Sequence, residues 1–164
     1  MKEIFSRRSV RRFTDEKPDR EEIERLLRAA MCAPSAGNQR PWEFIVVEQK
    51  ELLCRLADFS PYAKPLLGAQ TAIVVLGNPE RMRFPENWEQ DLGACCENLW
   101  LEATHIGLGT VWLGCAPLKE RMDKVRDILG LAPTLLPYAV FPIGRAAETP
   151  ADRENWEPAR VRFL

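Results

Sequence analysis

The sequence is poor in the features that mark membrane, nucleic-acid-binding and metal-binding proteins. Its 164 residues include one histidine, no Cys-x-x-Cys pair and no apolar run of the roughly 20 residues that a membrane-spanning helix needs. The 23 basic and 24 acidic side chains nearly cancel, so no basic field extends over the whole molecule to hold nucleic acid. The amino-terminal stretch MKEIFSRRS lacks the apolar core of a secretion signal. We therefore expect a cytoplasmic protein with no membrane segment, no bound metal and no nucleic-acid partner.

Two further absences restrict how phosphates and thiols could act. The glycines of residues 107–114 give neither the dinucleotide-binding fingerprint nor the Walker spacing with its lysine, so side chains must hold any phosphate. The cysteines are odd in number and irregularly spaced, which predicts reduced thiols that pack in the interior. They are Cys32, Cys54, Cys95, Cys96 and Cys115.

The hydrophobic pattern predicts one domain, residues 1–164, with helices and strands in an α/β-like order. The 46% hydrophobic content is enough for one core and too little for two. Helices are expected near residues 4–5, 20–33, 50–59, 88–106 and 117–131, and strands at 42–48, 71–77, 107–114 and 138–144. Residues 145–164 are polar and are expected to form an arm that lies over a neighbour.

Three of these elements carry specific signals. Asp19 and Glu22 have the spacing of a capping box at a helix start. The run TAIVVLG, residues 71–77, is apolar on both faces, which is typical of a strand inside a sheet that is covered on both sides. The helix of residues 88–106 is apolar most of the way round, so it needs a cover on most sides. A second copy of the chain is a plausible cover, since symmetric dimers are the commonest oligomers.

The stretch RRSVRRF, Arg7 to Phe13, places four arginines within six residues. Guanidinium groups offer planar, bidentate donors to phosphate oxygens, and a serine hydroxyl can add another donor. In an extended segment Arg7, Ser9 and Arg11 point the same way and could converge on one dianion, whereas Arg8 would point elsewhere unless the backbone turns. Taken alone, the stretch is equally compatible with a solvated basic end, a nucleic-acid contact or a kinase substrate.

Further motifs narrow these alternatives. The stretch PSAGNQRPW, residues 34–42, precedes a buried strand, and GLGTVWLG, residues 107–114, follows the long helix. Together with RRSVRRF, in this order and over nearly the whole chain, they resemble the nitroreductase family of flavin enzymes. The resemblance implies an α+β, three-layer fold, in which helices flank a central, mostly antiparallel sheet. It also implies an intertwined homodimer.

The resemblance also implies FMN as the cofactor and assigns residues to it. The opening motif, which contacts the phosphate and the polar edge of FMN, is matched by Arg7, Arg8, Ser9 and Arg11. The loop that reaches the flavin from the other subunit is matched by Pro34, Ser35 and Asn38. Leu113 and Gly114 match the strand that passes backbone amides near the hydride-accepting nitrogen, and Arg153 matches a basic position in the tail. Arg12 has no matching role and is expected to be a surface charge.

The sequence departs from the family pattern at three points. Arg40 stands where the glutamine before Pro-Trp is usual, and that glutamine is displaced to Gln39. Ala151 replaces a basic residue that many relatives carry shortly before the position of Arg153. The chain is also short for the family, so residues 59–67 and 83–88 are the candidate segments that roof a substrate pocket.

The implied activity is transfer of reducing equivalents from NADH or NADPH to a nitroaromatic, a quinone or a similar small acceptor, in a ping-pong reaction. Reduced FMN carries the hydride or electrons itself, so no catalytic acid, base or nucleophile is expected from the protein. His105 is expected to have a capping or packing role at the end of the long helix. The alternative is a module that stores or senses FMN without turning over an external acceptor.

Arg40 yields the first testable prediction. We expect Arg40→Gln to leave the reduction potential of the flavin nearly unchanged and to alter mainly the preference among acceptors. The reason is that Gln39 can take the usual glutamine role while solvent screens an exposed Arg40. The measurement is the midpoint potential of both proteins. A drop of tens of millivolts, at roughly 30 mV per 1.4 kcal/mol for a two-electron couple, would instead make Arg40 a cofactor ligand.

Overall fold

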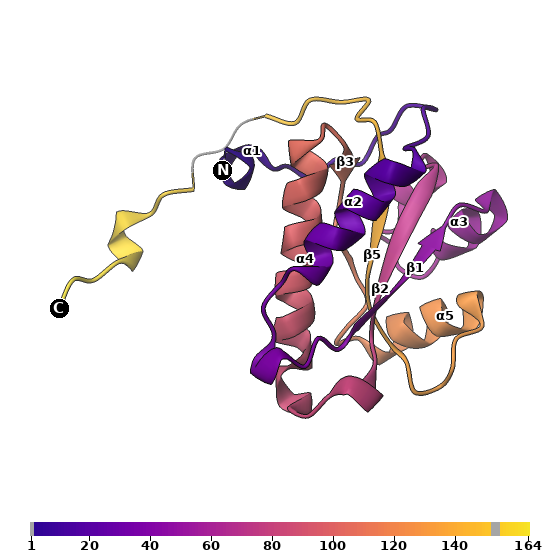
Figure 1. The fold of residues 1–164 in the computed structure, drawn as a ribbon. Coiled ribbons are helices and arrows are strands. Elements are labelled where there is room, and N and C mark those ends of the chain that lie inside the picture. The colour runs from indigo at the N-terminus through magenta and orange to yellow at the C-terminus, as the bar shows by residue number, and fades with distance from the viewer. Residues whose placement is uncertain (1, 152–154) are drawn as a thin grey trace.

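The structure, a computed structural model, describes residues 2–151 and 155–164 (Figure 1). Within them, the helices are α1 (Glu3–Ser6), α2 (Arg20–Met31), α3 (Lys50–Leu56), α4 (Trp88–His105) and α5 (Lys119–Leu129). The strands are β1 (Trp42–Val47), β2 (Thr71–Gly77), β3 (Gly109–Thr110), β4 (Leu113–Gly114) and β5 (Leu136–Gly144). Every expected helix is present, and the strands differ from expectation at one place.

All strands belong to one antiparallel sheet with the order β1-β2-β5-β3, and β4 also pairs with β5. The single strand expected at residues 107–114 is therefore wrong, because the ladder to β5 is interrupted between β3 and β4. Thr110 pairs with Ile143 and Leu113 with Val140, so the register is the same on both sides of the break. That register places Pro142 opposite Val111, and proline has no N–H to donate to a ladder.

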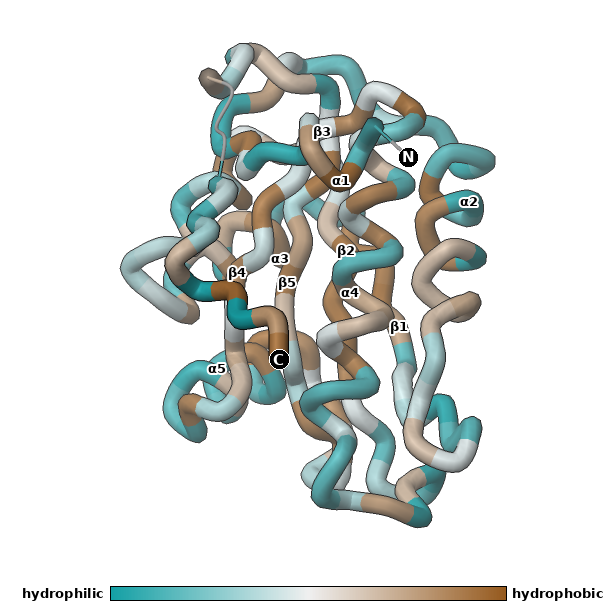
Figure 2. Tube along the Cα trace, turned by 90° about the vertical axis from the view of Figure 1, so that its left-hand side faces the viewer, coloured by the Kyte–Doolittle hydropathy of each residue, from teal (hydrophilic) through white to brown (hydrophobic). Residues whose placement is uncertain are grey.

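Helices cover both faces of the sheet and make three layers (Figures 1 and 2). On one face α2 and α4 pack through Leu26 and Leu99 against Ile73, Val75 and Phe141. On the other face α3 and α5 pack through Leu53 and Val125 against Val74 and Val140. Neighbouring residues of β2 thus enter opposite cores, as its two-sided apolar pattern predicts. The expected α+β fold with a central antiparallel sheet is confirmed.

The helix α2 shows how local signals set the boundaries of an element. Asp19 Oδ1 accepts a hydrogen bond from Glu22 N at 2.8 Å, and Glu22 Oε2 accepts one from Asp19 N at 3.0 Å. This is the expected capping box, and an N-cap of this kind stabilises a helix by about 1 kcal/mol. The tube of α2 is hydrophobic toward the sheet and hydrophilic on its outer side (Figure 2).

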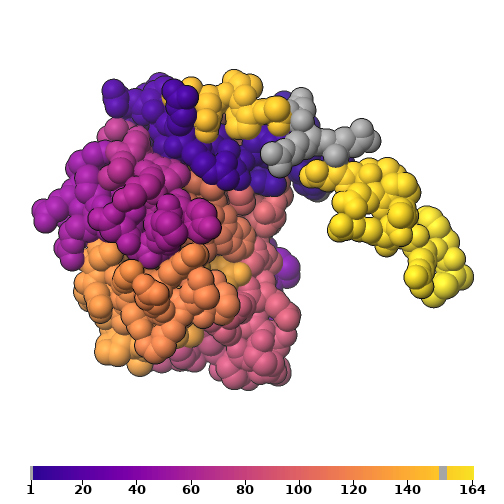
Figure 3. Space-filling view, turned by 180° about the vertical axis from the view of Figure 1, so that it is seen from behind, coloured from indigo at the N-terminus to yellow at the C-terminus, as the bar shows by residue number. Residues whose placement is uncertain are grey.

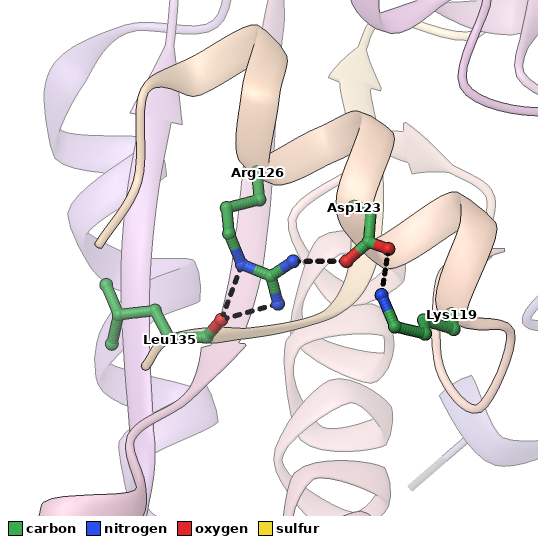
Figure 4. Close-up of polar contacts among 4 residues, drawn as sticks. All are labelled: Lys119, Asp123, Arg126 and Leu135. Carbon is green, nitrogen blue, oxygen red and sulfur yellow. Dashed lines mark hydrogen bonds and ion pairs between the residues drawn. The ribbon is translucent and has the colours of Figure 1, made fainter. Parts of the chain in front are cut away.

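Polar contacts fix α5 against the chain that leads into β5 (Figure 4). Arg126 donates to the carbonyl oxygen of Leu135 from Nε at 3.3 Å and from Nη2 at 3.1 Å, and its Nη1 donates to Asp123 at 2.5 Å. Lys119 also contacts Asp123, and the two cations lower the pKa of that carboxyl group. The helix is thereby held next to β4, where Arg121 of α5 donates to the carbonyl oxygen of Gly114.

The long helix α4 is buried along most of its length but borders an open groove. Leu92, Cys95, Cys96, Leu99 and Ala103 have no exposed surface. The groove lies between α1, α2 and α4 and is lined by Ile4, Ala29, Cys32 and Leu101 together with Glu3, Asn98, Glu102 and His105. Exposed Ile4 and Met31 lie on the adjoining elements. The side of α4 that carries Leu101 is therefore the one that this chain leaves partly uncovered.

The expectation that all five cysteines pack in the interior is wrong for two of them. Cys95, Cys96 and Cys115 are buried, whereas Cys32 and Cys54 are exposed and free. Burial raises the pKa of Cys95 and of Cys115 to about 12, so both thiols stay protonated near neutral pH.

The carboxyl-terminal residues extend away from the three layers (Figures 1 and 3). Residues 155–164 are exposed throughout, including the large side chains of Trp156 and Phe163. Exposed aromatic side chains on an extended segment are unfavourable in water and suit contact with another surface. In the part of the chain that the structure describes, no helix is both long and apolar enough to traverse a lipid bilayer.

Gly109 yields the second prediction, because β3 and the arginine segment approach each other there. A Cβ atom at Gly109 would lie 2.7 Å from Cγ1 and 2.9 Å from Cβ of the buried Val10. We expect Gly109→Ala to lower the free energy of unfolding by about 1–3 kcal/mol, measured by urea denaturation. The control is Gly68→Ala, since the nearest atom to its added methyl is 3.9 Å away. Equal stability of the two variants would contradict this close packing.

Candidate functional site

The arginine segment, residues 7–13, is held between β3 and the chain that follows β5. Val10 N donates to Thr110 O at 2.9 Å, and Phe13 forms an isolated bridge with Ala146. The side chain of Glu148 accepts hydrogen bonds from the backbone N–H groups of Arg11 at 2.7 Å and Arg12 at 3.2 Å. These bonds fix the position of the segment's backbone, and the successive N–H groups of Arg11 and Arg12 converge on one oxygen of Glu148. In Figure 3 the amino-terminal part of the chain lies directly beside this later segment.

One pocket of about 240 Å³ opens beside this segment. Its described lining residues are Arg7, Arg8, Ser9, Arg11, Pro150, Ala151 and Asn155. Three arginines, a serine and an asparagine thus border a small space, and no acidic residue is among its described lining residues. Such a donor set is complementary to a phosphate group or a similar anion.

Arg8 lines the same pocket as Arg7, Ser9 and Arg11, an arrangement that the sequence allows only if the backbone turns. The guanidinium of Arg8 turns back and donates to the carbonyl oxygens of Phe5 at 2.7 Å, Arg7 at 2.8 Å and Ala151 at 3.0 Å. The carbonyl groups at the end of a helix such as α1 lack partners within the helix, and a nearby arginine satisfies them. Arg8 therefore joins α1 to the far wall of the pocket.

Arg7 links the pocket to α4. Its guanidinium carbon lies 4.1 Å from the centroid of the Trp100 ring, and its Nε lies 3.7 Å from Oε1 of Glu97. A guanidinium stacked on an indole face is held by a cation–π attraction. This stacking orients Arg7 before any ligand binds. The indole N–H of Trp100 is buried and has no hydrogen-bond partner within the described structure.

The second predicted segment, residues 34–41, is a tight and strained connection between α2 and β1. Gly37, Asn38 and Arg40 have φ values of 52°, 55° and 46°, in the left-handed region. For Asn38 and Arg40, which are not glycines, this conformation costs roughly 1–2 kcal/mol each. Ser35 Oγ accepts a hydrogen bond from Arg40 N at 2.9 Å and closes the turn. The side chains of Asn38 and Arg40 are exposed.

Two buried polar residues hold this connection: Gln39, which the sequence marks as the displaced glutamine, and Asp91, which sequence reasoning missed. Asp91, in the first turn of α4, accepts from Ala36 N at 2.8 Å and from Gln39 Nε2 at 2.6 Å. Asp91 is 5% exposed and Gln39 is 8% exposed. The sequence did contain a signal for the burial of Asp91, because Asp91 is four residues before Cys95 on a helix face that is otherwise apolar.

The third predicted segment is β4, at an edge of the sheet. Leu113 is buried, and Gly114 is partly exposed. Cys115 N donates to Tyr138 O at 2.9 Å, so the alternation of an antiparallel ladder directs the N–H of Gly114 away from β5. The Gly114 carbonyl accepts from Arg121 at 3.3 Å, and the guanidinium of Arg121 lies 5.8 Å from the centroid of the exposed Tyr62 ring. Tyr62 belongs to residues 59–67, one of the expected roof segments.

The structure brings the four residues of the arginine segment together but not all the predicted residues. Arg7 contacts Trp100 and the 34–41 connection contacts Asp91, which lies nine residues earlier on α4. At 1.5 Å per residue the two contacts are about 14 Å apart along the helix. Figure 1 shows the two segments near opposite ends of α4. Arg153 lies outside the described residues.

Among the described residues, the titratable groups near these segments have structural contacts. His105 Nδ1 lies 3.0 Å from Glu3 Oε1, and this hydrogen bond lowers the pKa of Glu3 to about 2. The contact joins α1 to the end of α4, and the His105 side chain is exposed. Burial raises the pKa of Tyr138 to about 12, and its hydroxyl donates to Glu89 O at 2.9 Å. No cluster of potential metal ligands occurs among the residues that the structure describes.

Comparison with known proteins identifies the family. The model of the nitroreductase family matches residues 4–67 and 60–145, so the chain belongs to this family. The resemblance inferred from the ordered motifs is confirmed.

Three relatives illustrate the similarity. A protein of Archaeoglobus fulgidus, provisionally named an NADH dehydrogenase/NAD(P)H nitroreductase, is 39% identical over 99% of this chain and 92% of its own length. A crystal structure from Clostridium acetobutylicum, provisionally named an NADH oxidase, is 42% identical and superposes with a TM-score of 0.95 over 98% of both chains. A provisionally named nitroreductase of Desulfovibrio desulfuricans, solved in complex with FMN, is 28% identical with a TM-score of 0.87, over 99% of this chain and 95% of that one.

Proposed function

We propose that this chain is an FMN-dependent oxidoreductase, which takes reducing equivalents from NADH or NADPH and passes them to nitroaromatics, quinones or similar small acceptors. Membership of the nitroreductase family supports this assignment, as do the names of the relatives and the FMN complex of one of them. The observation that carries the proposal is the pocket lined by Arg7, Arg8, Ser9 and Arg11 in a chain of this family. A cytoplasmic location would give such an enzyme access to NADH and NADPH.

The chemistry of the pocket fits the phosphate of FMN. Arg7, Ser9 and Arg11 would bind the phosphate, and Arg8 would hold the pocket wall through its bonds to backbone carbonyls. The orientation of Arg7 by Trp100 lowers the entropy that binding must otherwise remove from a long side chain. Arg153 is proposed as a further phosphate contact from the tail.

A homodimer would complete the site. Because the pocket and the 34–41 connection are separated along α4, we propose that Pro34, Ser35 and Asn38 meet the flavin in the pocket of a second copy. The open groove beside Leu101 and the exposed aromatic residues of the arm, residues 145–164, offer apolar surface for that contact. Chains 1–164 would each form one domain, and the arm of each would lie over the other.

The protein's part in the reaction would be to bind, orient and exclude water. Reduced FMN supplies the hydride or electrons when it is bound. The N–H of Gly114 points away from β5 and is available to a cofactor ring at the sheet edge, next to Leu113. The buried thiols remain protonated and the described residues near the pocket include no paired carboxylates, so neither acid–base nor nucleophilic assistance is assigned to the protein.

The third prediction concerns the phosphate donors. We expect Arg7→Ala and Arg11→Ala to weaken FMN binding to the apoprotein more than Ser9→Ala. Hydrogen bonds to charged groups contribute about 1.5–3 kcal/mol, and a single hydroxyl is at the low end of that range. Titration calorimetry measures the affinities. Arg12→Ala is the matched control, because it removes the same charge from a residue that does not line the pocket. Losses that are equal for Ser9 and the two arginines would show that the arginines face solvent.

The fourth prediction separates the oxidoreductase from a flavin-storage or sensing module. Both would bind FMN, but only the enzyme needs rapid reduction by a nicotinamide. We expect the visible absorbance of bound flavin to be lost soon after anaerobic mixing with NADH or NADPH and to return when a quinone or nitroaromatic is added. Bleaching that takes hours would favour the module and remove the proposed activity.

A further inference from the structure

Asp91 is an ionisable residue in an apolar environment. Its carboxylate is 5% exposed and adjoins the core formed by α2, α4 and one face of the sheet. Within the described residues, no lysine, arginine or histidine lies at ion-pair distance from it. Burying a carboxylate without a cation is costly unless N–H donors and dipoles replace water. The first turn of α4 supplies a favourable dipole, and Ala36 N and Gln39 Nε2 supply the hydrogen bonds.

Gln39 extends the contact to a second loop. Its Nε2 also donates to Phe84 O at 3.1 Å, and its Oε1 accepts from Phe84 N at 2.9 Å. Arg83 donates to the carbonyl oxygen of Gly37 from the same loop. Both ends of the Gln39 amide are therefore used, and the 34–41 connection is held between α4 and the loop of residues 78–87.

The hydrogen bonds of Asp91 and Gln39 to Ala36 and Phe84, here called the clamp, maintain a backbone that would otherwise relax. Two non-glycine residues of the connection, Asn38 and Arg40, have left-handed conformations. Strain of this kind persists only where the surroundings enforce it, and it concentrates at ligand-binding segments. A connection that only joined α2 to β1 would need neither the strain nor the buried charge. The clamp instead fixes where Ser35 and the exposed Asn38 are presented.

We propose that Asp91 is a positioning residue that acts in trans. Through Ala36 and Gln39 it would hold Ser35 and Asn38 in the conformation that meets the flavin in the arginine pocket of a second copy. This inference rests on the proposed function for the flavin and for the two-chain site. Asp91 itself touches no ligand, so its removal should act through the loop.

The first experiment breaks and restores the Asp91–Gln39 contact. In Asp91→Asn the remaining oxygen can still accept from Ala36, but the new NH2 group faces the NH2 group of Gln39. Rotating the Gln39 amide only moves the mismatch to Phe84. We expect Asp91→Asn to weaken FMN binding to the apoprotein at least tenfold, which corresponds to about 1.4 kcal/mol. Gln39→Glu, which opposes two carboxylates, should have a similar effect.

The double variant Asp91→Asn with Gln39→Glu exchanges the amide and the carboxylate across the contact. The NH2 group at position 91 can then donate to the carboxylate at position 39, whose other oxygen still accepts from Phe84 N, but the hydrogen bond to Phe84 O is lost. We expect this variant to bind FMN more tightly than either single variant, since contacting residues couple, and less tightly than wild type because of the lost bond. Its net charge equals that of wild type, so it keeps the test valid if Asp91→Asn alone fails to fold.

Glu89→Gln is the matched control for the loss of a negative charge near the amino-terminal end of the α4 dipole. It removes one negative charge from the same turn of α4, but Glu89 is exposed and, among the described residues, its side chain makes no hydrogen bond or ion pair with the 34–41 connection. We expect its FMN affinity to change less than twofold. Losses that are equal in Glu89→Gln and Asp91→Asn, or an unchanged affinity in Asp91→Asn, would overturn the inference.

The second experiment tests whether Asp91 acts across subunits. Differently tagged chains that carry Asp91→Asn or Arg11→Gln are co-expressed, and the mixed dimer is isolated. If the loop acts in trans, one site of this dimer receives both changes and the other receives neither, so about half of the wild-type flavin content remains at full affinity. A mixed dimer with no intact site would place Asp91 in cis and overturn the proposal. Wild-type protein that binds no FMN would refute the proposed function and this inference together.

Discussion

The rigid length of α4 is the constraint on which the candidate site depends. The helix is buried along its apolar face, so it cannot shorten or bend to bring its two ends together. Arg7 is stacked near one end and the 34–41 connection is bonded to the first turn at the other. In the proposed homodimer, a flavin that contacts both segments would lie between the two chains. The separation of the segments along α4 in one chain supports that proposal.

The arginine segment shows how a nearly neutral protein can maintain a concentrated positive site. Its backbone is fixed by Glu148 and by pairing with β3, and its guanidinium groups are divided among different partners. The Arg8 guanidinium donates to backbone carbonyl oxygens, whereas the Arg7 guanidinium is stacked on Trp100 and lies near Glu97. These contacts reduce the mutual repulsion of the cations and fix the pocket before an anion enters. Preorganisation of this kind lowers the conformational cost of binding.

Local signals made most of the fold and the arginine pocket predictable. The capping box at Asp19 and the two-sided apolar run of β2 are properties of short segments, and both behave as expected. The break between β3 and β4 was missed because it depends on Pro142, a residue of another strand that only the register brings opposite Val111. The Asp91–Gln39 contact was missed for a similar reason, since the two residues are 52 positions apart. The prediction that Cys32 and Cys54 lie in the interior was wrong, because the helical pattern alone does not say which helix faces one chain leaves exposed.

The electrostatic effect of Arg40, the residue that departs from the family pattern, depends on what surrounds its side chain. Its backbone N–H is fixed by Ser35 Oγ and its φ is 46°, so the direction in which the side chain leaves the loop is set by the backbone. Gln39, next to it, is buried and its amide is hydrogen-bonded at both ends, so the glutamine role expected of Gln39 from the sequence would cost its contacts to Asp91 and Phe84. In a single chain the Arg40 side chain is exposed to solvent. In the proposed homodimer a second copy would desolvate it, and its electrostatic effect would grow with the extent of that contact, because a charge acts more strongly where water is excluded.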